Sequence, residues 1–309
     1  DVPSIVGHGP LGRCGLFLGR PGGEQLPVAA PGAQGLIGFC SAEILEAGPD
    51  IQWVQLPYAG AERCVALSAI HERNILVTNA QRIYGPEIAE HVMAMILSFT
   101  RGLYRFIPAQ SEGAWDRRLV PEERLWELEG KTLLVVGLGG IGTEVARLGA
   151  AMGMKVLATR NSRREGPEFV EYVGLADELP DLTHRADIVV NAAPLTLATV
   201  DLFDADFFSA MKPTAYFINV GRGGSVVTAD LVEALEDGKL AGAGLDVTDP
   251  EPLPQGHPLW SMPNVIITPH VAARSDLRSE RLWVVLRENL RRYVAGEPML
   301  SVVDTARGY

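Results

Sequence analysis

The sequence predicts an α/β protein in which a doubly wound parallel sheet is accompanied by a second, smaller α/β layer. Apolar strand-like segments alternate with helical segments from about residue 105 to residue 272. A glycine-rich turn at residues 137–142 joins one such strand to a helix. With 309 residues the chain exceeds one typical hydrophobic core, and two domains of ordinary size are therefore expected.

The glycine-rich turn begins after Leu133–Val136, an apolar run typical of a buried parallel strand. Gly137, Gly139 and Gly142 have the G-x-G-x-x-G spacing. The first glycine permits a tight turn, the second lets a pyrophosphate approach the backbone, and the third lets the next helix pack closely. That helix, running to about Met152, would direct unpaired N–H groups and its positive dipole end at the phosphates. A plain glycine turn is the alternative, but the strand–turn–helix context favours a dinucleotide site.

The segments after the glycine motif read as a regular series of strands with helices between some of them. The strands are expected at Lys155–Thr159, Asp187–Asn191, Ala215–Asn219, Gly242–Val247 and Val265–Thr268. A helix over Thr228–Asp237 is closed by Gly238. This series predicts a Rossmann-type doubly wound order. A final amphipathic helix is expected from Leu277 to about Val294.

Shorter elements are expected before the glycine motif, and they imply a parallel α/β layer. The strands are expected at Ile5–Val6, Leu36–Phe39, Ile51–Leu56 and Ile75–Val77. Ser41 is a suitable N-cap for a helix through about Ala47, and a second helix is expected over Ala61–Glu72. The strongest helix is Pro86–Leu103, whose apolar face is wide enough for burial between two domains. Residues 10–35 are rich in Gly and Pro and are assigned no fold.

Composition and charge argue against several classes of function. The net charge of −11 argues against a surface for nucleic acid or anionic membrane, although a local positive site could still hold a small anionic substrate. No apolar stretch reaches the roughly 20 residues that cross a bilayer, and the first residues show no signal-peptide pattern. Cys14, Cys40 and Cys64 form neither a zinc pattern nor a disulfide framework. Free thiols in a reducing cytoplasm are therefore expected, and no metal site is predicted.

The end of the second strand in such a fold distinguishes NAD from NADP. A carboxylate there accepts from the ribose 2′-hydroxyl of NAD, whereas an arginine suits the 2′-phosphate of NADP. Here the strand is followed by Arg160-Asn-Ser162-Arg163-Arg164, with no carboxylate at its end. Guanidinium groups bind phosphate through forked, charge-assisted hydrogen bonds, and Ser162 could add a donor. A solvated basic turn is the alternative, but the pattern favours NADP(H), with NAD(H) possible.

Three polar segments follow the last three strands, at the carboxyl ends where open α/β sheets bind ligands. They are Asn219-Val-Gly-Arg222-Gly-Gly, Asp246-Val-Thr-Asp-Pro-Glu251-Pro-Leu and Thr268-Pro-His270. The order and composition of these motifs resemble the D-isomer-specific 2-hydroxyacid dehydrogenase family. The resemblance extends from about Ile51 to Val303, whereas residues 1–50 match poorly.

The resemblance implies a two-domain enzyme. Residues 105–272 would form the dinucleotide-binding, Rossmann-type domain. Residues 1–104 and 273–309 would form a smaller, flavodoxin-like α/β domain that binds substrate. Members of the family are usually dimers joined through their cofactor domains, so a homodimer is also implied.

The resemblance assigns catalytic roles to three residues. Arg222 matches the arginine that binds the carboxylate and carbonyl oxygen of the substrate, Glu251 the acid that hydrogen-bonds the catalytic histidine, and His270 the general acid/base. Histidine titrates near neutrality, so it can protonate the oxygen of a 2-keto acid as hydride reaches the carbon. Taken singly, each of the three could be a structural residue. No catalytic role is expected for His8, His71, His91, His184 or His257.

Cofactor and substrate contacts are implied for a larger set. The cofactor residues are Gly137, Gly139, Gly140, Ile141, Gly142, Arg160, Asn161, Ser162, Arg163, Ala193, Pro194, Val220, Gly221, Arg222, Asp246 and His270. Asp246 resembles the residue that faces the nicotinamide carboxamide, although it could instead cap a turn. Tyr58-Ala59-Gly60 resembles the loop whose N–H groups hold the substrate carboxylate, together with Arg222 and His270. An aromatic ring at Tyr58 or Tyr84 could shape the substrate pocket or could only pack.

Together with the basic segment after the second strand, the resemblance implies an NADP(H)-preferring D-2-hydroxyacid dehydrogenase that acts mainly as a reductase of a small 2-keto acid. Glyoxylate and hydroxypyruvate are the substrates that the resemblance implies first. One alternative is an NAD-dependent enzyme similar to phosphoglycerate dehydrogenase, against which the lack of a ribose-binding carboxylate argues. Another is a non-catalytic nicotinamide-sensing protein, similar to the corepressors that share this fold. A basic nucleic-acid arm would support that alternative, and the sequence shows none.

Overall fold

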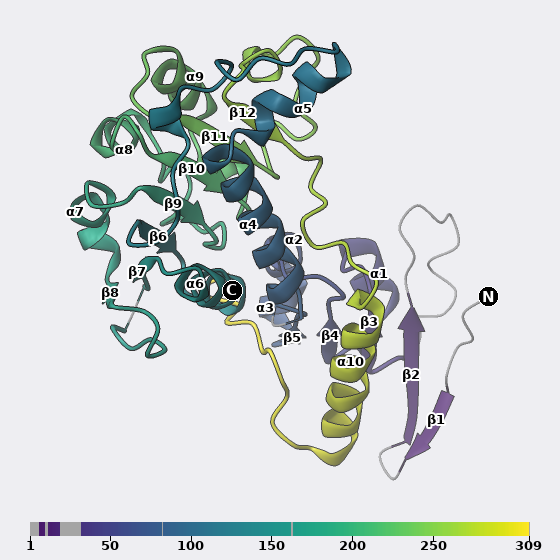
Figure 1. Cartoon of the computed structure of the whole chain (residues 1–309). Coiled ribbons are helices and arrows are strands. Elements are labelled where there is room, and N and C mark those ends of the chain that lie inside the picture. The colour runs from purple at the N-terminus through teal and green to yellow at the C-terminus, as the bar shows by residue number, and fades with distance from the viewer. Residues whose placement is uncertain (1–5, 10–11, 19–31, 82, 162, 309) are drawn as a thin grey trace. The chain divides into compact units, whose positions relative to one another are not determined.

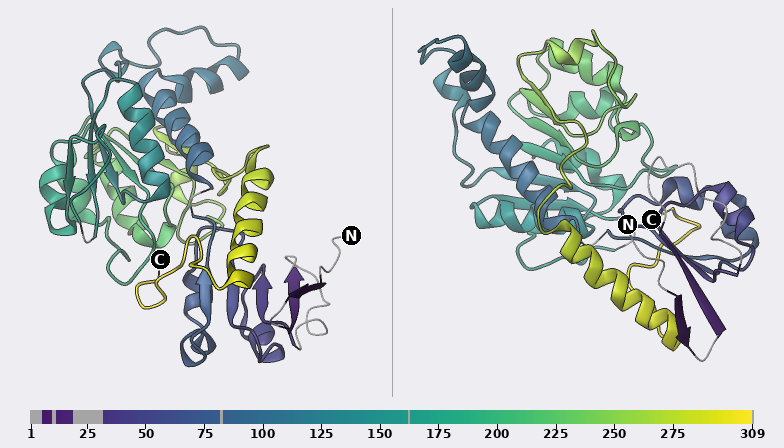
Figure 2. Two further views of the ribbon diagram at one scale, coloured as in Figure 1. Left: turned by 90° about the horizontal axis from the view of Figure 1, so that it is seen from below. Right: turned by 90° about the vertical axis from the view of Figure 1, so that its right-hand side faces the viewer.

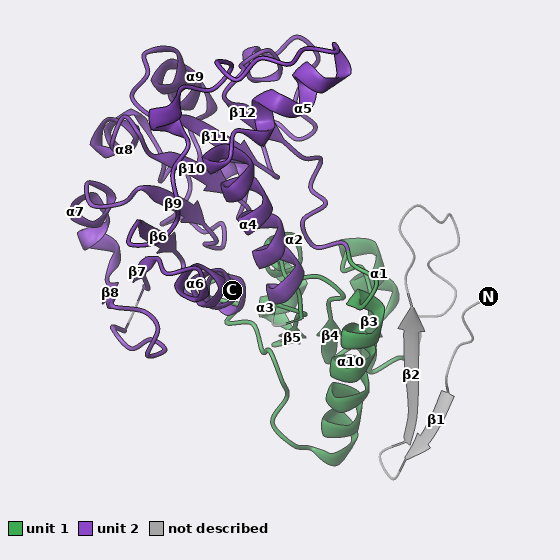
Figure 3. Cartoon of the chain, viewed as in Figure 1, with its two compact units in different colours: residues 1–84, 275–309 green, residues 85–274 purple. Residues whose placement is uncertain are grey.

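The computed structural model describes residues 6–9, 12–18, 32–81, 83–161 and 163–308. The chain divides into two compact units: unit 1 comprises residues 1–84 and 275–309, and unit 2 comprises residues 85–274 (Figure 3). The sequence suggested boundaries after residues 104 and 272. The first boundary lies earlier in the structure because the long helix α4 (Gly85–Thr100) packs against helix α6 (Gly140–Ala151) of unit 2.

Unit 2 is built on a seven-stranded sheet that is parallel throughout, in the order β12-β11-β10-β9-β6-β7-β8 (Figure 1). Its strands are β6 (Thr132–Val136), β7 (Lys155–Thr159), β8 (Tyr172–Gly174), β9 (Ile188–Asn191), β10 (Tyr216–Asn219), β11 (Gly242–Leu245) and β12 (Val265–Ile267). The strand order reverses between β6 and β9, where Val136 pairs with Asn191. The sheet confirms the predicted doubly wound fold, in which ligands bind beyond the carboxyl ends of the strands at this reversal.

Helices cover both faces of this sheet (Figures 1 and 2). Helices α4 and α6 lie on one face, and α7 (Leu179–Thr183), α8 (Ala205–Ala210) and α9 (Thr228–Glu236) lie on the other. The remaining helical segments are α5 (Leu103–Ser111), η2 (Glu122–Arg124), η3 (Ala176–Glu178), η4 (Gly223–Ser225) and η5 (Pro258–Trp260). Neighbouring residues of β10 serve opposite faces: Tyr216 stacks on Phe99 of α4 at 4.7 Å, whereas Phe217 packs toward α8.

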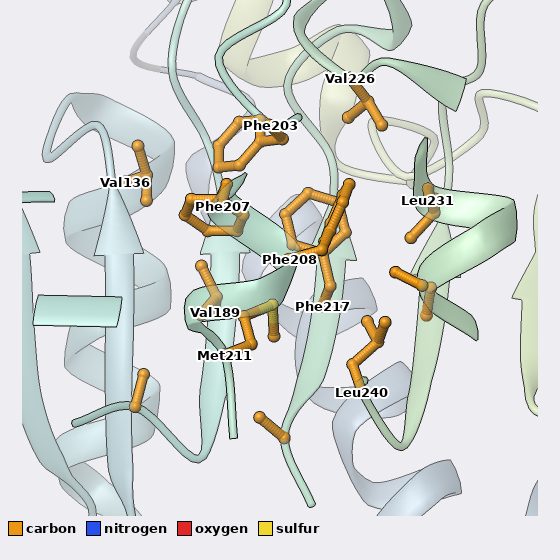
Figure 4. Close-up of a cluster of buried hydrophobic side chains, with 14 of the residues drawn as sticks. Val136, Val189, Phe203, Phe207, Phe208, Met211, Phe217, Val226, Leu231 and Leu240 are labelled. Carbon is orange, nitrogen blue, oxygen red and sulfur yellow. The ribbon is translucent and has the colours of Figure 1, made fainter. Parts of the chain in front are cut away.

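An apolar cluster fills the space between the sheet and α7 to α9 (Figure 4). The ring of Phe217 on β10 lies 5.0 Å from Phe203, 6.2 Å from Phe207 and 5.4 Å from Phe208, measured between centroids. Burying an aromatic side chain of this size contributes about 1.5–3 kcal/mol. The cluster therefore fixes β9 and β10 against α8, and with them the loops that follow these strands.

Unit 1 contains a five-stranded sheet in the order β1-β2-β3-β4-β5. Its strands are β1 (Val6–Gly9), β2 (Gly12–Leu18), β3 (Gly35–Ile37), β4 (Trp53–Gln55) and β5 (Leu76–Thr78). Strands β2 to β5 run parallel, but β1 is antiparallel to β2, so the expected parallel arrangement is wrong at this edge. Only two residues separate β1 from β2, too few for the crossover that a parallel pair needs.

The helices of unit 1 are α1 (Ala42–Ala47), α2 (Glu62–Val65), α3 (Ser68–Glu72) and α10 (Arg278–Ala295). Ser41 caps α1 as predicted, since its Oγ accepts the Ile44 N–H at 3.4 Å. The single helix expected over residues 61–72 is instead two, because the backbone of Leu67 is extended and its side chain packs on the apolar cluster of the unit. Helix α10 is joined to the sheet by Tyr293, whose ring stacks at 4.9 Å on the buried Trp53 of β4.

Cys40 and Cys64 form a disulfide whose Cα atoms lie 5.3 Å apart. The expectation of free thiols is therefore wrong for this pair. The bond joins the segment after β3 to helix α2, which the chain brings together only after 24 residues. The side chain of Cys14 lies outside the described part of the chain. Among the described residues, no helix combines the length and the apolarity that crossing a membrane requires.

Candidate active site

The glycine motif lies at the carboxyl end of β6, where the strand order reverses. Gly137 has a φ of +94°, and a Cβ there would lie 2.7 Å from the Cα of Ala193 in the loop after β9. A Cβ at Gly142 would lie 2.1 Å from the carbonyl oxygen of Gly137. The first and third glycines are therefore required by the packing of the protein itself. Ala193 and Pro194, two predicted cofactor residues, are brought to this same turn.

Gly139 differs, because a Cβ there would meet no heavy atom of the described residues within 4 Å, its chain neighbours aside. Helix α6 begins at Gly140, and both glycines are exposed. The N–H groups of Gly140, Ile141 and Gly142 belong to the first turn of α6, so they have no acceptor within the helix. Open space beside the second glycine and unpaired donors at a helix N-terminus fit a bound pyrophosphate.

Arg160 follows β7, and its Nε is buried without a hydrogen-bond partner among the described residues. Burial lowers the pKa of Arg160, and the nearby Arg163 adds to the effect. The guanidinium is thus partly removed from water, and an anionic ligand could compensate for that loss. Asn161 and Arg163 are exposed beside it, and Ser162 lies outside the described residues.

Arg164 belongs to the same basic segment but has a different role. Its Nη1 lies 2.6 Å from Glu178 and donates to the hydroxyl of Tyr172 at 3.0 Å. Hydrogen bonds from Arg164, from the Leu175 N–H and from Tyr172 lower the pKa of Glu178 to about 2. Arg164 therefore takes part in a structural network, whereas the Nε of Arg160 has no hydrogen-bond partner among the residues that the structure describes.

The loops that carry Arg222, Glu251 and His270 leave the same edge of the sheet. Asn219 at the end of β10 pairs with Leu245 of β11, which in turn pairs with Ile267 of β12. In parallel strands this register aligns the carboxyl ends of the three strands. The structure therefore gathers the three predicted catalytic residues at the edge that also carries the glycine motif.

Two buried asparagines hold the turn that contains Arg222. Asn191 Nδ2 donates to Asn219 Oδ1 at 2.9 Å and to Ser225 Oγ at 2.8 Å. Asn219 Nδ2 and Ser225 Oγ both donate to the carbonyl oxygen of Arg222, at 3.0 and 2.7 Å. The N–H of Gly221 donates to Asn219 Oδ1 at 3.1 Å. The role of these two asparagines in holding the Arg222 turn was not predicted from the sequence. A polar residue at the end of an otherwise apolar strand is the pattern that could have indicated it.

The Arg222 turn also packs against the segment that leads to Glu251. A Cβ at Gly223 would lie 1.9 Å from the carbonyl oxygen of Thr248, so this close approach requires glycine. Arg222 itself is partly buried, and its Nη1 donates to the carbonyl of Gly221 at 2.8 Å. Contact between the two loops therefore sets the position of the arginine backbone relative to the acidic segment.

His270 and Glu251 form a close pair, with Nδ1 2.7 Å from Oε1. Both side chains are about half exposed, at 48% and 44%, so a ligand can reach them. The backbone of His270 has a φ of +52°, and its N–H donates to the carbonyl oxygen of Asp246 at 2.8 Å. Since Glu251 occupies Nδ1, Nε2 is the ring nitrogen that can exchange a proton with a ligand.

The buried carboxylate of Asp246 holds the loop after β12. It accepts the Thr268 hydroxyl at 2.6 Å and the N–H groups of Val271 and Ala272 at 2.9 and 3.0 Å. His91 Nε2 lies 2.9 Å from Thr268 Oγ1. Because this hydroxyl gives its proton to Asp246, Nε2 of His91 must be the donor. Asp246 therefore caps a turn, one of its two expected roles, and His91, for which no catalytic role was expected, belongs to the same network.

The predicted substrate loop, Tyr58–Gly60, lies in unit 1 between β4 and α2. The Tyr58 ring packs 5.7 Å from that of Phe39, and burial raises the pKa of its phenol. The Tyr84 hydroxyl donates to the carbonyl of Pro57, and the guanidinium of Arg278 lies 5.7 Å from the Tyr84 ring centroid. Both aromatic side chains thus have defined partners within unit 1.

Comparison with known proteins gives a consistent result at the level of sequence. Residues 93–272 match the family model described as D-isomer specific 2-hydroxyacid dehydrogenase, NAD binding domain. The glyoxylate reductase/hydroxypyruvate reductase of Homo sapiens is 33% identical over 287 residues, which cover 90% of this chain and 86% of that protein.

Solved structures agree. The NADPH-dependent glyoxylate/hydroxypyruvate reductase of Sinorhizobium meliloti, in complex with NADP and sulfate, has a TM-score of 0.79 and 32% identity, covering 90% of this chain and 87% of that one. A D-isomer specific 2-hydroxyacid dehydrogenase from Xanthobacter autotrophicus Py2, in complex with NADPH and MES, has a TM-score of 0.80 and 32% identity, covering 92% and 86%. The family match spans more than half of the chain and the human relative nine tenths of it. The chain therefore belongs to the D-isomer specific 2-hydroxyacid dehydrogenase family of NAD(P)-dependent oxidoreductases.

Proposed function

We propose that this enzyme is an NADP(H)-preferring reductase of small 2-keto acids, with glyoxylate and hydroxypyruvate as the first candidates. The observation that carries the proposal is the His270–Glu251 pair, 2.7 Å apart and half exposed, at the sheet edge that also holds Arg222 and the glycine motif. A proton donor, a fixed cation and a dinucleotide loop at one edge are the parts that reduction of a keto acid requires.

His270 is proposed to give a proton from Nε2 to the carbonyl oxygen of the substrate. The Glu251 carboxylate accepts a hydrogen bond from Nδ1–H, which fixes the ring and stabilises the charge on the imidazole before transfer. Arg222 is proposed to polarise the carbonyl and to bind the substrate carboxylate, as its buried backbone network allows little movement of the turn. The bound nicotinamide supplies the hydride.

The preference for NADP(H) is proposed from Arg160. Its partly buried guanidinium follows β7, where this fold meets the adenosine ribose. Gly139 to Gly142 would hold the pyrophosphate. Asp246 Oδ2, which accepts one described hydrogen bond, is proposed to accept also from the carboxamide. The relatives from Sinorhizobium meliloti and Xanthobacter autotrophicus were crystallised with NADP and NADPH, which supports this choice.

The carboxylate of the substrate is proposed to bind to the N–H groups of the Tyr58–Gly60 loop. The human and Sinorhizobium relatives are named glyoxylate/hydroxypyruvate reductases, which supports a short substrate. The partly buried phenol of Tyr58 leaves less room beside the loop than a small side chain would.

We further propose that the enzyme is a cytoplasmic homodimer joined through its cofactor domain. Leu103 and Ile107 of α5 and Trp115 beyond it are 44%, 58% and 90% exposed. Large apolar side chains grouped on one exposed helix and its continuation are typical of an interface. Light scattering of the purified protein tests the dimer, and Ile107→Lys should shift the protein toward monomer.

Cell fractionation tests the proposed cytoplasmic location of the enzyme.

A panel assay tests the proposed function. The purified enzyme is mixed with NADPH or NADH and with glyoxylate, hydroxypyruvate, pyruvate, phosphohydroxypyruvate or a bulkier 2-keto acid, and loss of absorbance at the nicotinamide band is followed. We expect turnover with NADPH and the two shortest acids. Turnover only with NADH and phosphohydroxypyruvate would favour a phosphoglycerate dehydrogenase-like enzyme. No oxidation with any acid, together with tight NADPH binding, would favour a nicotinamide-sensing protein.

A further inference from the structure

The loop after β4 has an unusual pattern of hydrogen bonds. Three consecutive carbonyl groups each accept from the segment after β5. Ala59 accepts from Asn79 Nδ2 at 2.7 Å, Tyr58 accepts from the Ala80 N–H at 3.0 Å, and Pro57 accepts from the hydroxyl of Tyr84. No described residue accepts from the N–H groups of residues 58–60. The loop is thus held to the rest of unit 1 through its carbonyl groups, and its N–H groups can donate to a ligand.

The geometry of the peptide bond shows in which direction these N–H groups point. In a trans peptide the C=O of one residue and the N–H of the next point to opposite sides of the chain. The two cis peptide bonds among the described residues lie elsewhere, in the segment that leads to Glu251. Asn79 binds the Ala59 carbonyl, so the N–H of Gly60 points away from Asn79. In the same way, the bond to the Tyr58 carbonyl orients the N–H of Ala59, and the bond to the Pro57 carbonyl orients the N–H of Tyr58.

Asn79 is placed to hold this orientation firmly. It is only 2% exposed, its own N–H donates to the carbonyl of Ser301 at 3.0 Å, and its Oδ1 accepts the Gln81 N–H at 3.3 Å. With Oδ1 occupied by an N–H donor and Nδ2 by a carbonyl, the amide has a single arrangement that satisfies both ends. An asparagine can donate to the Ala59 carbonyl and accept from the Gln81 N–H at the same time, which neither a carboxylate nor an aliphatic side chain of this size can do.

We propose that Asn79 is a positioning residue for the substrate carboxylate, and that Tyr84 assists it. By holding the carbonyl side of the Pro57–Gly60 loop, the two side chains present its N–H groups as a preformed anion cradle. Backbone donors that are already oriented bind an anion without a cost of ordering the loop. This inference rests on the proposed function, in which the loop binds the carboxylate of a 2-keto acid.

The test uses Asn79→Asp, which keeps the size of the side chain and the Oδ1 acceptor but replaces the donor to Ala59 with an oxygen. The Ala59 carbonyl is partly buried, and leaving such an acceptor without its donor weakens the binding that depends on it by about 5- to 150-fold. We expect the KM for glyoxylate to rise by a factor in this range. The inhibition constant of oxamate, a carboxylate analogue, should rise by about the same factor. The KM for NADPH should not change, because the cofactor makes no use of this loop.

Tyr84→Phe removes only the hydroxyl that binds the Pro57 carbonyl, and it should raise the same two constants by a smaller factor. Asn74→Asp is the matched control, since Asn74 is an exposed residue of unit 1 and the charge change is the same. It should leave all three constants as in the wild type. If Asn79→Asp does not fold, Tyr84→Phe decides alone.

The outcomes separate the inference from the function on which it rests. A wild-type enzyme that reduces no 2-keto acid would refute the proposed function. A wild-type enzyme that is active, beside an Asn79→Asp enzyme with unchanged glyoxylate and oxamate constants, would refute the positioning role. A rise of the NADPH KM equal to that for glyoxylate would also refute it, because the effect would then be a general loss of structure.

Discussion

Arg160→Ala should weaken the use of NADPH selectively. The Nε of Arg160 is buried without a partner among the described residues, and burial lowers the pKa of the side chain. The guanidinium is therefore partly desolvated before a ligand arrives, which lowers the competition from water that a phosphate meets at Nε. A hydrogen bond to a charged group contributes about 1.5–3 kcal/mol, which corresponds to a factor of about 10–150. We expect the KM for NADPH to rise by that factor, and the KM for NADH, which has no 2′-phosphate, to stay unchanged.

Initial rates at saturating glyoxylate, measured over a series of concentrations of each cofactor, give both values. Arg164→Ala is the matched control, because it removes the same charge from the same segment, but from a side chain that is paired with Glu178. It should leave the preference for NADPH over NADH close to that of the wild type. Equal losses with NADPH and NADH in Arg160→Ala, or equal losses in the two variants, would refute the reasoning.

Three further predictions concern other parts of the chain. Gly139→Ala should keep the melting temperature of the wild type, since the added Cβ meets no described atom. It should weaken NADPH binding, measured by calorimetry, on the order of tenfold or more, and unchanged affinity would contradict the phosphate site. Cys40→Ser should lower the free energy of unfolding by about 3 kcal/mol in denaturant titrations, given the sequence separation of 24, and dithiothreitol should lower it in the wild type alone. The depressed pKa of Glu178, about 2, makes its contribution to stability complete above its ordinary pKa and lost as the pH falls toward 2. Acid titration of Glu178→Gln should lack that loss, and identical acid transitions would contradict it.

The strands of unit 2 could be predicted from the sequence almost to the residue. Lys155–Thr159 is β7 as expected, and the other predicted strands differ by one or two residues at their ends. The short strand β8 (Tyr172–Gly174) was not predicted. Such strands are buried on both faces, so their apolar runs are continuous and easily recognised. The glycine motif could also be predicted, because its spacing is a local pattern within one strand–turn–helix segment. The contact that requires Gly142 lies within that turn, whereas the contact of Gly137 with Ala193 could not be predicted.

Features that depend on distant parts of the chain could not be predicted. The disulfide between Cys40 and Cys64 requires β3 and α2 to pack together, which no local pattern reports. The bonds that join Asn191 to Asn219 depend on the register of β9 with β10, since the two residues are opposite each other only in that register. His91 looked like an ordinary helical histidine because its partner, Thr268, lies 177 residues further along the chain.

The break between α2 and α3 has another cause. Residues 61–72 have the composition of one helix, and local propensity favours continuing it through Leu67. Packing of that side chain on the apolar cluster of unit 1 overrides the weak local preference.

The central claim is that His270 supplies the proton when a 2-keto acid is reduced. The most direct measurement is the kcat of His270→Gln with NADPH and glyoxylate, together with the dissociation constant of NADPH from the same protein. Glutamine keeps a polar side chain of similar length but cannot act as an acid. The account predicts that kcat falls by about 10²–10⁴-fold while NADPH binding is retained. A His270→Gln enzyme that keeps the kcat of the wild type would contradict it.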